Sequence, residues 1–148
     1  MDKVMIQAKE IGVTVKAMFN PKELSIEKSV SWTPKEGSQS DEPPAEFSKP
    51  TPANLSVTLY FDTYEEGGDV YAKYVHDLEL LAMVIADKKR PPHCLFVWGK
   101  QIFQGVITSL TQKYTMFLSD GTRVRCECAV KMMAASSAET GSKKGGSS

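Results

Sequence analysis

The chain contains several short stretches in which apolar and polar residues alternate, which is the pattern of a β-strand with one buried face. In residues 55–62 the large apolar residues share one parity: Leu55, Val57, Leu59 and Phe61. The most regular alternation runs from Thr122 to Met132, and its apolar side consists of Val124, Cys126, Cys128, Val130 and Met132. Its polar side consists of Arg123, Arg125, Glu127 and Lys131. Both stretches are predicted to be half-buried strands.

Further strands are predicted between glycine turn signals in the second half of the chain. Residues 94–98 form an apolar strand that turns at Gly99, and residues 103–110 form the next one. Extended character continues from there to Leu118. Ser119–Gly121 then predicts a hairpin turn before the last strand, because glycine tolerates positive φ.

Near the N-terminus the same alternation predicts a hairpin of two strands. The first is a short strand containing Val13, Val15 and Ala17. The second covers 24–32, where one parity holds Leu24, Ile26, Lys28, Val30 and Trp32. Asn20-Pro21 lies between them and is a turn signal, since proline presets φ and asparagine suits turn positions. Two strands around a short turn indicate a hairpin.

One helix is predicted between the strands. Gly67-Gly68 ends the preceding extended stretch, and Asp69 can accept hydrogen bonds from the first free N–H groups of a helix. The helix is expected from about Val70 to Ala86, with one apolar stripe at 3.6-residue spacing. The stripe consists of Val70, Tyr74, Leu78, Leu81, Ala82 and Ile85. Lys88–Arg90 would favour its C-terminal dipole end, and Pro91-Pro92 cannot continue it. The fold class expected is therefore mainly β with one flanking helix.

Two segments differ in composition from the rest. Residues 33–54 hold five prolines, several serines and one large apolar residue, Phe47, so they cannot form a core of their own. They are interpreted either as a flexible surface loop or as an arm that docks on a neighbouring subunit through Phe47. From Ala134 the chain consists of Ala, Ser, Gly and Lys residues with few others. The expected organisation is one domain at 1–133, containing the loop or arm, and a flexible tail at 134–148.

Composition excludes several classes of function. Eighteen basic and eighteen acidic residues give a formal net charge of zero, which argues against nucleic-acid binding. The longest apolar run, 80–86, is far below the roughly 20 residues of a membrane-spanning helix. Charges near the N-terminus argue against a secretory signal. Three cysteines suit reduced thiols in a protein made in the cytoplasm. No membrane anchor is expected.

The sequence contains no recognisable set of catalytic residues. Cys126 and Cys128 share one strand face at roughly 7 Å, but with Cys94, His76 and His93 they fit no familiar zinc spacing. They are better interpreted as small buried hydrophobes. Neither a phosphate-binding glycine loop nor a nucleophile motif is present. No metal, no cofactor and no enzymatic activity are expected.

Several separated motifs, in this order, are similar to those of one protein family. They are Phe19-Asn-Pro-Lys-Glu-Leu-Ser25 with Trp32, Leu55-Ser-Val-Thr-Leu-Tyr-Phe-Asp-Thr-Tyr64, Arg90-Pro-Pro-His-Cys-Leu-Phe-Val-Trp-Gly99, Phe103-Gln-Gly-Val-Ile107 and Tyr114-Thr-Met-Phe-Leu-Ser-Asp-Gly-Thr-Arg-Val-Arg125. Together they resemble the N-terminal tube-type or baseplate-adaptor domain of contractile injection systems, the phage-tail-like particles that drive a rigid tube through a target envelope. The resemblance covers about 19–132.

The resemblance implies a small β-barrel or sandwich with one flanking helix, in subunits that form stacked rings, commonly hexamers. It places the protein in the inner tube or at the junction between tube and baseplate hub, for instance as a tube initiator. Implied partners are further copies of the chain, neighbouring tube and spike or hub proteins, and sheath or baseplate proteins. It would be made in the bacterial cytoplasm and then join a particle that can be extracellular. Longer members carry a LysM-like module where this chain ends in Gly, Ser and Lys, so that module is expected to be missing or removed.

The residues themselves fit such an assembly. Exposed strand edges need protection or pair with another chain, and a head-to-tail ring lets each subunit offer an edge to the next. The candidate lumen or inter-subunit contacts are Phe47, Arg123, Arg125, Glu127 and Lys131. The plainer interpretation of the charged strand face is a solvated surface of a monomer.

Two other classes of function stay open at this point. One is a monomeric β-barrel that binds a ligand or protein against Trp32, Tyr60 and Trp98. The other is a small hydrolase that uses His76 or His93, although no partner constellation supports it.

Overall fold

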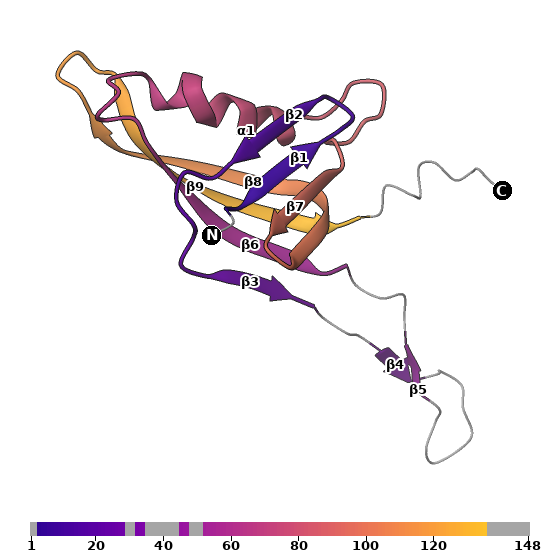
Figure 1. The fold of residues 1–148 in the computed structure, drawn as a ribbon. Coiled ribbons are helices and arrows are strands. Elements are labelled where there is room, and N and C mark those ends of the chain that lie inside the picture. The colour runs from indigo at the N-terminus through magenta and orange to yellow at the C-terminus, as the bar shows by residue number, and fades with distance from the viewer. Residues whose placement is uncertain (1–2, 29–31, 35–44, 48–51, 136–148) are drawn as a thin grey trace.

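The computed structural model describes residues 3–28, 32–34, 45–47 and 52–135, the two short stretches through their backbone alone. In these residues nine strands and one helical segment follow one another (Figure 1). Their bounds are β1 Met5–Ala8, β2 Val13–Lys16, β3 Leu24–Glu27, β4 Trp32–Pro34, β5 Ala45–Phe47, β6 Asn54–Asp62, η1 Tyr71–Val75, α1 His76–Leu81, β7 Cys94–Trp98, β8 Gln101–Phe117 and β9 Arg123–Ala134. The predicted class, mainly β with a single helix, is confirmed.

Seven strands form one antiparallel sheet in the order β2-β1-β7-β8-β9-β6-β3. β4 and β5 pair with each other in a separate two-stranded sheet. Among the described strands β2 and β3 are the two edges of the large sheet, and nothing joins them. The predicted closure into a barrel is therefore not formed by the described part of one chain, whose sheet is open.

The alternation in β6 and β9 is reproduced in detail. The predicted apolar side of both strands is almost wholly buried, and it consists of Leu55, Val57, Leu59, Phe61, Val124, Cys126, Cys128, Val130 and Met132. Nine register pairs join the two strands from Asn54↔Met133 to Asp62↔Arg125. The predicted turn follows β8, where the Leu118 N–H donates to the Thr122 carbonyl oxygen at 2.8 Å and Gly121 has φ +91°.

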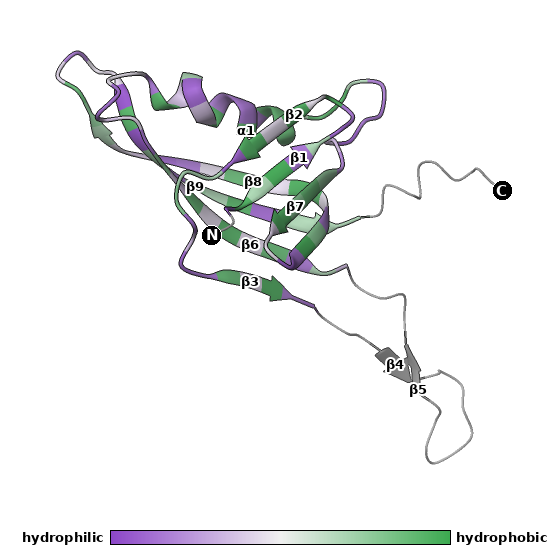
Figure 2. Cartoon of the chain, viewed as in Figure 1, coloured by the Kyte–Doolittle hydropathy of each residue, from purple (hydrophilic) through white to green (hydrophobic). Residues whose placement is uncertain are grey.

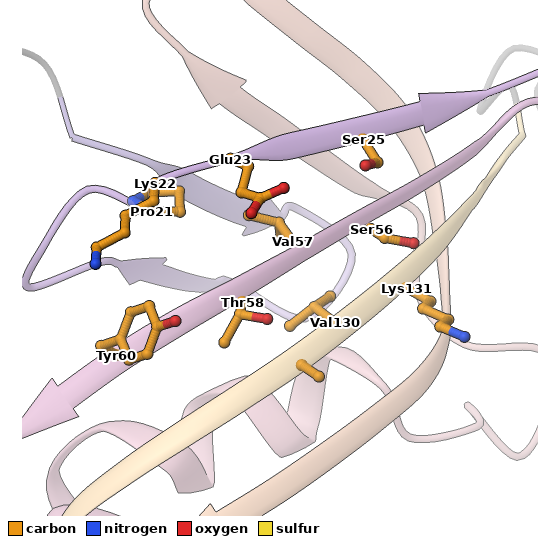
Figure 3. Close-up of a pocket in the computed structure, with 11 residues that line it drawn as sticks. Pro21, Lys22, Glu23, Ser25, Ser56, Val57, Thr58, Tyr60, Val130 and Lys131 are labelled. Carbon is orange, nitrogen blue, oxygen red and sulfur yellow. The ribbon is translucent and has the colours of Figure 1, made fainter.

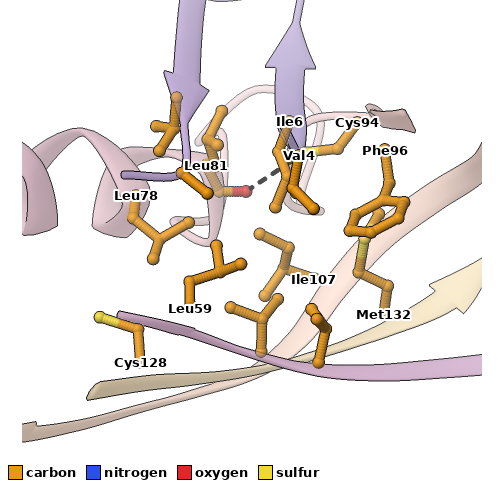
Figure 4. Packing of buried hydrophobic residues seen from close by; sticks show 14 of the residues in the cluster. Val4, Ile6, Leu59, Leu78, Leu81, Cys94, Phe96, Ile107, Cys128 and Met132 are labelled. Carbon is orange, nitrogen blue, oxygen red and sulfur yellow. Dashed lines mark hydrogen bonds between the residues drawn. The ribbon is translucent and has the colours of Figure 1, made fainter. Parts of the chain in front are cut away.

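The core lies between the curved sheet and the helical segment (Figure 4). Leu78 and Leu81 of α1 point toward Leu59 of β6 and Ile107 of β8. Ile6 of β1 joins the same cluster, together with Val4 and Ala8, which alternate with the partly exposed residues Met5 and Gln7. In Figure 2 the outward side of the helix is hydrophilic and the strands beneath it are rich in hydrophobic residues.

The N-terminal hairpin was predicted between the wrong strands. β2 pairs with β1, around a turn in which Gly12 has φ +68°, whereas β3 pairs with β6 at the opposite edge of the sheet. Residues 17–23, with Asn20-Pro21, therefore connect the two edges and do not form a tight turn. Local alternation showed that both strands exist, but strand partners are set by packing across the sheet.

The helix begins where expected and ends earlier. The Tyr71 N–H donates to Asp69 Oδ1 at 3.2 Å, and α1 ends at Leu81 and not near Ala86. Its first turn is a π-helix, in which residues five apart stack. Val70 and Val75 are accordingly both fully buried, although a 3.6-residue stripe leaves out the second.

After the helix, residues 82–90 form a turn of their own. The Ile85 N–H donates to the Arg90 carbonyl oxygen at 2.8 Å, and the two residues form an isolated bridge. Lys88 and Lys89 thus lie in this turn, well beyond Leu81, and the prediction that they lie at the C-terminal end of the helix is wrong. Met83 and Val84 are left 56% and 63% exposed.

Candidate assembly surface

The outward side of four adjacent strands is polar, and we call it the polar face. It comprises the residues of β3, β6, β9 and the part of β8 beyond Gly105, its far half, that alternate with the positions facing the core. The strand registers arrange these residues in rows across the sheet: Ser25–Ser56–Lys131–Ser109, Thr58–Ala129–Thr111 and Tyr60–Glu127–Lys113. Short hydroxyl side chains predominate, and apolar side chains gather on the other side of the same strands.

Several charged side chains on the polar face lie beside a side chain of opposite charge. Lys113 lies directly opposite Glu127 in the register of β8 and β9. Arg125 donates from Nε to Asp62 Oδ2 at 2.9 Å. The pKa of Asp62 lies below its ordinary value, chiefly because the Tyr64 backbone N–H donates to its carboxylate, and further because of Arg125. Unlike charges that lie directly opposite each other stabilise a strand pair. On this face positive charges are therefore paired with negative ones, and charge of one sign does not build up.

Three of the five predicted contact residues lie on this surface. Arg125, Glu127 and Lys131 alternate with the buried side of β9, as their spacing predicts. Arg123 makes contacts of a different kind, described below. The backbone of Phe47 lies in β5 opposite Trp32. Its side chain is outside the described part of the chain, so its predicted contact with a neighbour stays a prediction.

A shallow groove of about 360 Å³ crosses the polar face (Figure 3). Lys22 and Glu23 lie at one side of it, and Lys131 of β9 lies across the strands from them. Its floor includes Thr58, and Tyr60 closes one end. Trp98, which was predicted together with Tyr60 as part of an aromatic pocket, does not line this groove and stands on β7, with β8 and β9 between it and β6.

The strands that carry the polar face end in two open edges. β7 pairs with β8 only from Gln101 to Gly105, whereas β8 continues to Phe117. Within the described residues, no strand pairs with β8 beyond Gly105 on the side away from β9. β3 is likewise open on the side away from β6. An exposed edge presents backbone hydrogen-bonding groups to another chain.

The far half of the β8–β9 hairpin is tied to the helix by a polar network around Arg123. The guanidinium donates to both carboxylate oxygens of Asp69, at 3.2 and 2.8 Å. It also lies over the rings of Tyr71 and Tyr114, with 4.8 and 5.4 Å to their centroids. Such stacking suits the planar guanidinium. The predicted lumen or inter-subunit role of Arg123 thus competes with an intramolecular one.

A second set of bonds continues this network along the open edge of β8. Glu79 of α1 accepts hydrogen bonds from Tyr71 Oη and from Gln112 Nε2, and Tyr114 Oη donates to Gln112 Oε1. The Tyr71 hydroxyl is the main reason why the pKa of Glu79 is lowered. Burial is the main reason why the pKa of Tyr114 rises to about 12. The edge strand is therefore held at a fixed distance from the helix.

A model of the family described as contractile injection system tube protein matches residues 3–143 of the chain. This chain belongs to that family. No curated protein matches it. The membership confirms the motif resemblance at the level of the family and makes the chain a structural component of the tube of a phage-tail-like particle.

In this tube protein the residues considered for chemistry do not converge. His76 of α1 lies beside Tyr71, with 5.9 Å between the ring centroids, and His93 lies near Glu10. The three cysteines are free and buried, and burial raises the pKa of Cys94 to about 12. The described residues contain no group of three or more His, Cys, Asp or Glu that could hold a metal ion. In the same part of the chain no helix is long and apolar enough to cross a membrane.

Glu10 joins the β1–β2 turn to the segment before β7. Its carboxylate accepts two hydrogen bonds from Arg90, at 3.0 and 2.7 Å, and one from the His93 backbone N–H at 2.9 Å. The hydrogen bond with Arg90 is the largest cause that lowers the pKa of Glu10 from 4.5 to about 2. A lowered carboxyl pKa stabilises the fold above pH 4.5, and this contribution is lost as the pH falls toward 2.

We expect Glu10→Gln to lower the free energy of unfolding by about 1 kcal/mol at pH 7, a modest figure because both partners are partly exposed. The difference from the unmodified protein should shrink as the pH falls from about 4.5 to about 2. Urea unfolding at about pH 7 and about pH 2.5 measures both values. Glu65→Gln, in the exposed loop before the helix, is the matched control. An equal loss at both pH values would contradict the ion-pair explanation.

Proposed function

We propose that this tube protein forms a closed ring that is one layer of the conduit, with the polar face turned toward the lumen. The observation that carries the proposal is the position of the two open edges. β3 and the far half of β8 bound the same four-strand sheet, β3-β6-β9-β8, on opposite sides. A subunit with an open edge on each side can pair with a copy of itself on both.

The strand directions allow β3 of one copy to pair with β8 of the next in the same antiparallel way as the strands within a subunit. Each of the three junctions within the four strands is antiparallel, so β3 runs antiparallel to β8. A second copy that is rotated about an axis roughly along the strands keeps its strand directions. Its β3 then meets the first copy's β8 in antiparallel orientation, and the junction between subunits continues the pattern within them. Head-to-tail contacts of this kind close into a ring when the rotation divides a full turn.

The composition of the two sides supports the orientation. The polar face carries serine and threonine hydroxyls and opposed charges such as Lys113 and Glu127, which suit a wetted channel. The opposite side of the same strands is the buried core, covered by α1. A barrel closed by the edges would put the core and helix outside and the polar face inside. A tube subunit of this kind conducts and transmits load, and no catalytic step is required of it.

Within the particle, the ring would be a layer of the inner tube or the layer at the junction with the baseplate hub. Its two rims would contact neighbouring tube and spike or hub proteins, and sheath or baseplate proteins would lie outside it. Family membership supports the tube assignment. The ring number that the family resemblance implies is six.

The test is the mass of the purified whole chain in solution, followed by negative-stain microscopy of the same sample. We expect closed rings about one subunit thick, or stacks of them, with the ring number read directly from top views. A single monomeric species, both alone and after mixing with its neighbouring tube protein, would contradict the proposal. It would instead favour a monomeric binding module that uses the groove of the polar face.

The orientation of the polar face is tested separately by labelling. Lys131→Cys should react with a small maleimide in both free subunits and rings. A maleimide attached to a bulky folded protein should label free subunits readily, and rings at least tenfold more slowly, because the lumen excludes it. Lys88→Cys, in the exposed turn after the helix, is the matched control and should be labelled equally in both states. Equal labelling of Lys131→Cys in rings and subunits would place the polar face outside.

A further inference from the structure

Beside the open edge of β8 lies a hollow with no occupant among the described residues. Its volume is about 280 Å³, and it lies between the end of α1 and the strand. Ala82, Met83, Ile107 and Leu110 supply its apolar lining, and Glu79 and Gln112 lie at its polar end. Met83 is 56% exposed. Apolar side chains left in this position beside an unpaired strand are typical of a surface that another chain covers.

We propose that Ile26 of a second copy of this chain fills that hollow, in a β3–β8 junction whose register places Ile26 opposite Leu110. The proposal rests on the ring described above and adds the contact that fixes its geometry. The occupant is a second copy because its β3 matches the edge of β8 in strand direction, in the side on which its apolar residue lies, and in charge.

The side of the sheet is the first match. Ile26 lies opposite Leu55 of β6, which is fully buried, so its side chain is on the core side although it is itself 43% exposed at the edge. Leu110 lies opposite Val130 of β9, which is also buried. Residues directly opposite in a sheet share a face. In a continuous sheet the second copy's Ile26 therefore faces the same side as Leu110, which is the side of the hollow.

Charge is the second match, and it selects the register. In antiparallel pairing the numbers of opposite residues have a constant sum, so Ile26 opposite Leu110 puts Ser25 opposite Thr111 and Glu23 opposite Lys113. The last pair joins unlike charges on the polar face. A shift by two residues toward the hairpin tip puts Ser25 opposite Lys113, and a shift the other way puts Glu23 opposite Thr111. Of these three registers only the proposed one brings an acid of the β3 edge to Lys113. A shift of four residues would bring Glu27 to Lys113, but it would move Ile26 from Leu110 to Tyr114, which does not line the hollow.

Disulfide trapping in the assembled whole chain tests the register. Ser25→Cys combined with Thr111→Cys places both thiols on exposed strand positions, where the substitutions leave the core unchanged. Three strand spacings, roughly 14 Å, separate the two positions within one chain, so a disulfide must join two copies. Mild oxidation should give a ladder of covalent multimers that extends beyond the dimer, because each subunit uses both edges.

Two shifted pairs serve as controls, Ser25→Cys with Lys113→Cys and Ser25→Cys with Ser109→Cys. We expect at least tenfold less cross-linked product from each. Equal or better cross-linking of a shifted pair would overturn the register. Rings without a cross-link in any of the three variants would overturn the junction while the proposed function stands. Neither rings nor cross-links in any of them would overturn both.

The contact of Ile26 itself is tested by Ile26→Ser, with Ile102→Ser as its matched control. Ile102 is 61% exposed near the β7–β8 turn, away from the proposed junction. Ile26→Ser should raise the concentration needed for ring formation at least tenfold and leave thermal unfolding of the free subunit nearly unchanged. Ile102→Ser should assemble like the unmodified chain. If Ile26→Ser formed rings at the same protein concentration as the unmodified chain, the proposed contact would be overturned.

Discussion

Substituting alanine for Gly105 is expected to lower the free energy of unfolding by about 3 kcal/mol, at the upper end of the usual cost of inserting a methyl group into a tightly packed site. Gly105 lies in β8 between Cys94 of β7 and Ala134 of β9. A Cβ atom there would be 2.1 Å from the Met133 carbonyl oxygen and 2.8 Å from its carbon. Both are backbone atoms, so no side chain can move aside to make room.

The consequence reaches beyond one strand. The end of β9 is held beside this position by the Ala135 N–H, which donates to the Gln104 carbonyl oxygen at 3.1 Å, and by the Ala134 N–H, which donates to the Ala53 carbonyl oxygen. A methyl group on Gly105 pushes β9 outward and strains both bonds. Among the described strands, β7, β1 and β2 pair with the four-strand sheet through this part of β8, so their docking should weaken together.

The control for Gly105→Ala is Gly121→Ala in the β8–β9 turn. Gly121 has φ +91°, and a Cβ atom added there would meet nothing within 4 Å. The cost at Gly121 is therefore conformational and amounts to about 1–2 kcal/mol. Urea unfolding of both variants separates the two effects. A Gly105→Ala protein as stable as Gly121→Ala, or more stable, would contradict the close backbone approach.

Sequence alone predicted well those strands in which every second residue is apolar because it is buried. β6 and β9 have one face against the core, so their apolar parity carries the whole signal. β7 was predicted with its observed bounds for a related reason, since Gly99 marks its end. β1 was missed although Val4, Ile6 and Ala8 alternate, because so short a pattern does not distinguish a strand from other extended chain.

Strand partners were not predictable in the same way. β2 and β3 are close in sequence and separated by a turn signal, yet they lie at opposite edges of the sheet. The helix end was misjudged because apolar residues continue at helical spacing through Ile85, whereas the bridge between Ile85 and Arg90 replaces the helical bonds. In the first case long-range strand pairing overrides the local pattern, and in the second a local bridge between residues five apart does so.

The candidate assembly surface was likewise predictable where it follows from local alternation and not where it depends on residues distant in the chain. Alternation in β9 was enough to place Arg125, Glu127 and Lys131 on one face. The network that engages Arg123 depends on the helix start at Asp69, which is 54 residues away in the chain. The open edge of β8 follows from a mismatch in length, because β7 has five residues and β8 has seventeen. The alternation pattern predicted β8 as two pieces of extended chain and gave no sign that one edge is free.

An alanine at position 61 is expected to produce the largest loss of stability, about 4 kcal/mol, within the range for removing a fully buried phenylalanine side chain. Phe61 is fully buried in β6 and stacks on Tyr74 of η1, with 5.3 Å between ring centroids. The substitution therefore removes core volume and the main aromatic contact between sheet and helical segment. Phe19→Ala, the same change at a residue that is 51% exposed, should cost less than about 1 kcal/mol.

Assembly gives this prediction a second measurement. The proposed ring would bind only folded subunits, so its formation should raise the apparent stability as the protein concentration rises. A domain has only about 5–15 kcal/mol of stability in total, and Phe61→Ala should leave a subunit that is partly unfolded when dilute and recovers structure as rings form. Thermal unfolding followed at several concentrations tests this. A melting temperature for Phe61→Ala that does not change with concentration, in samples that contain rings, would show that assembly and subunit folding are not coupled.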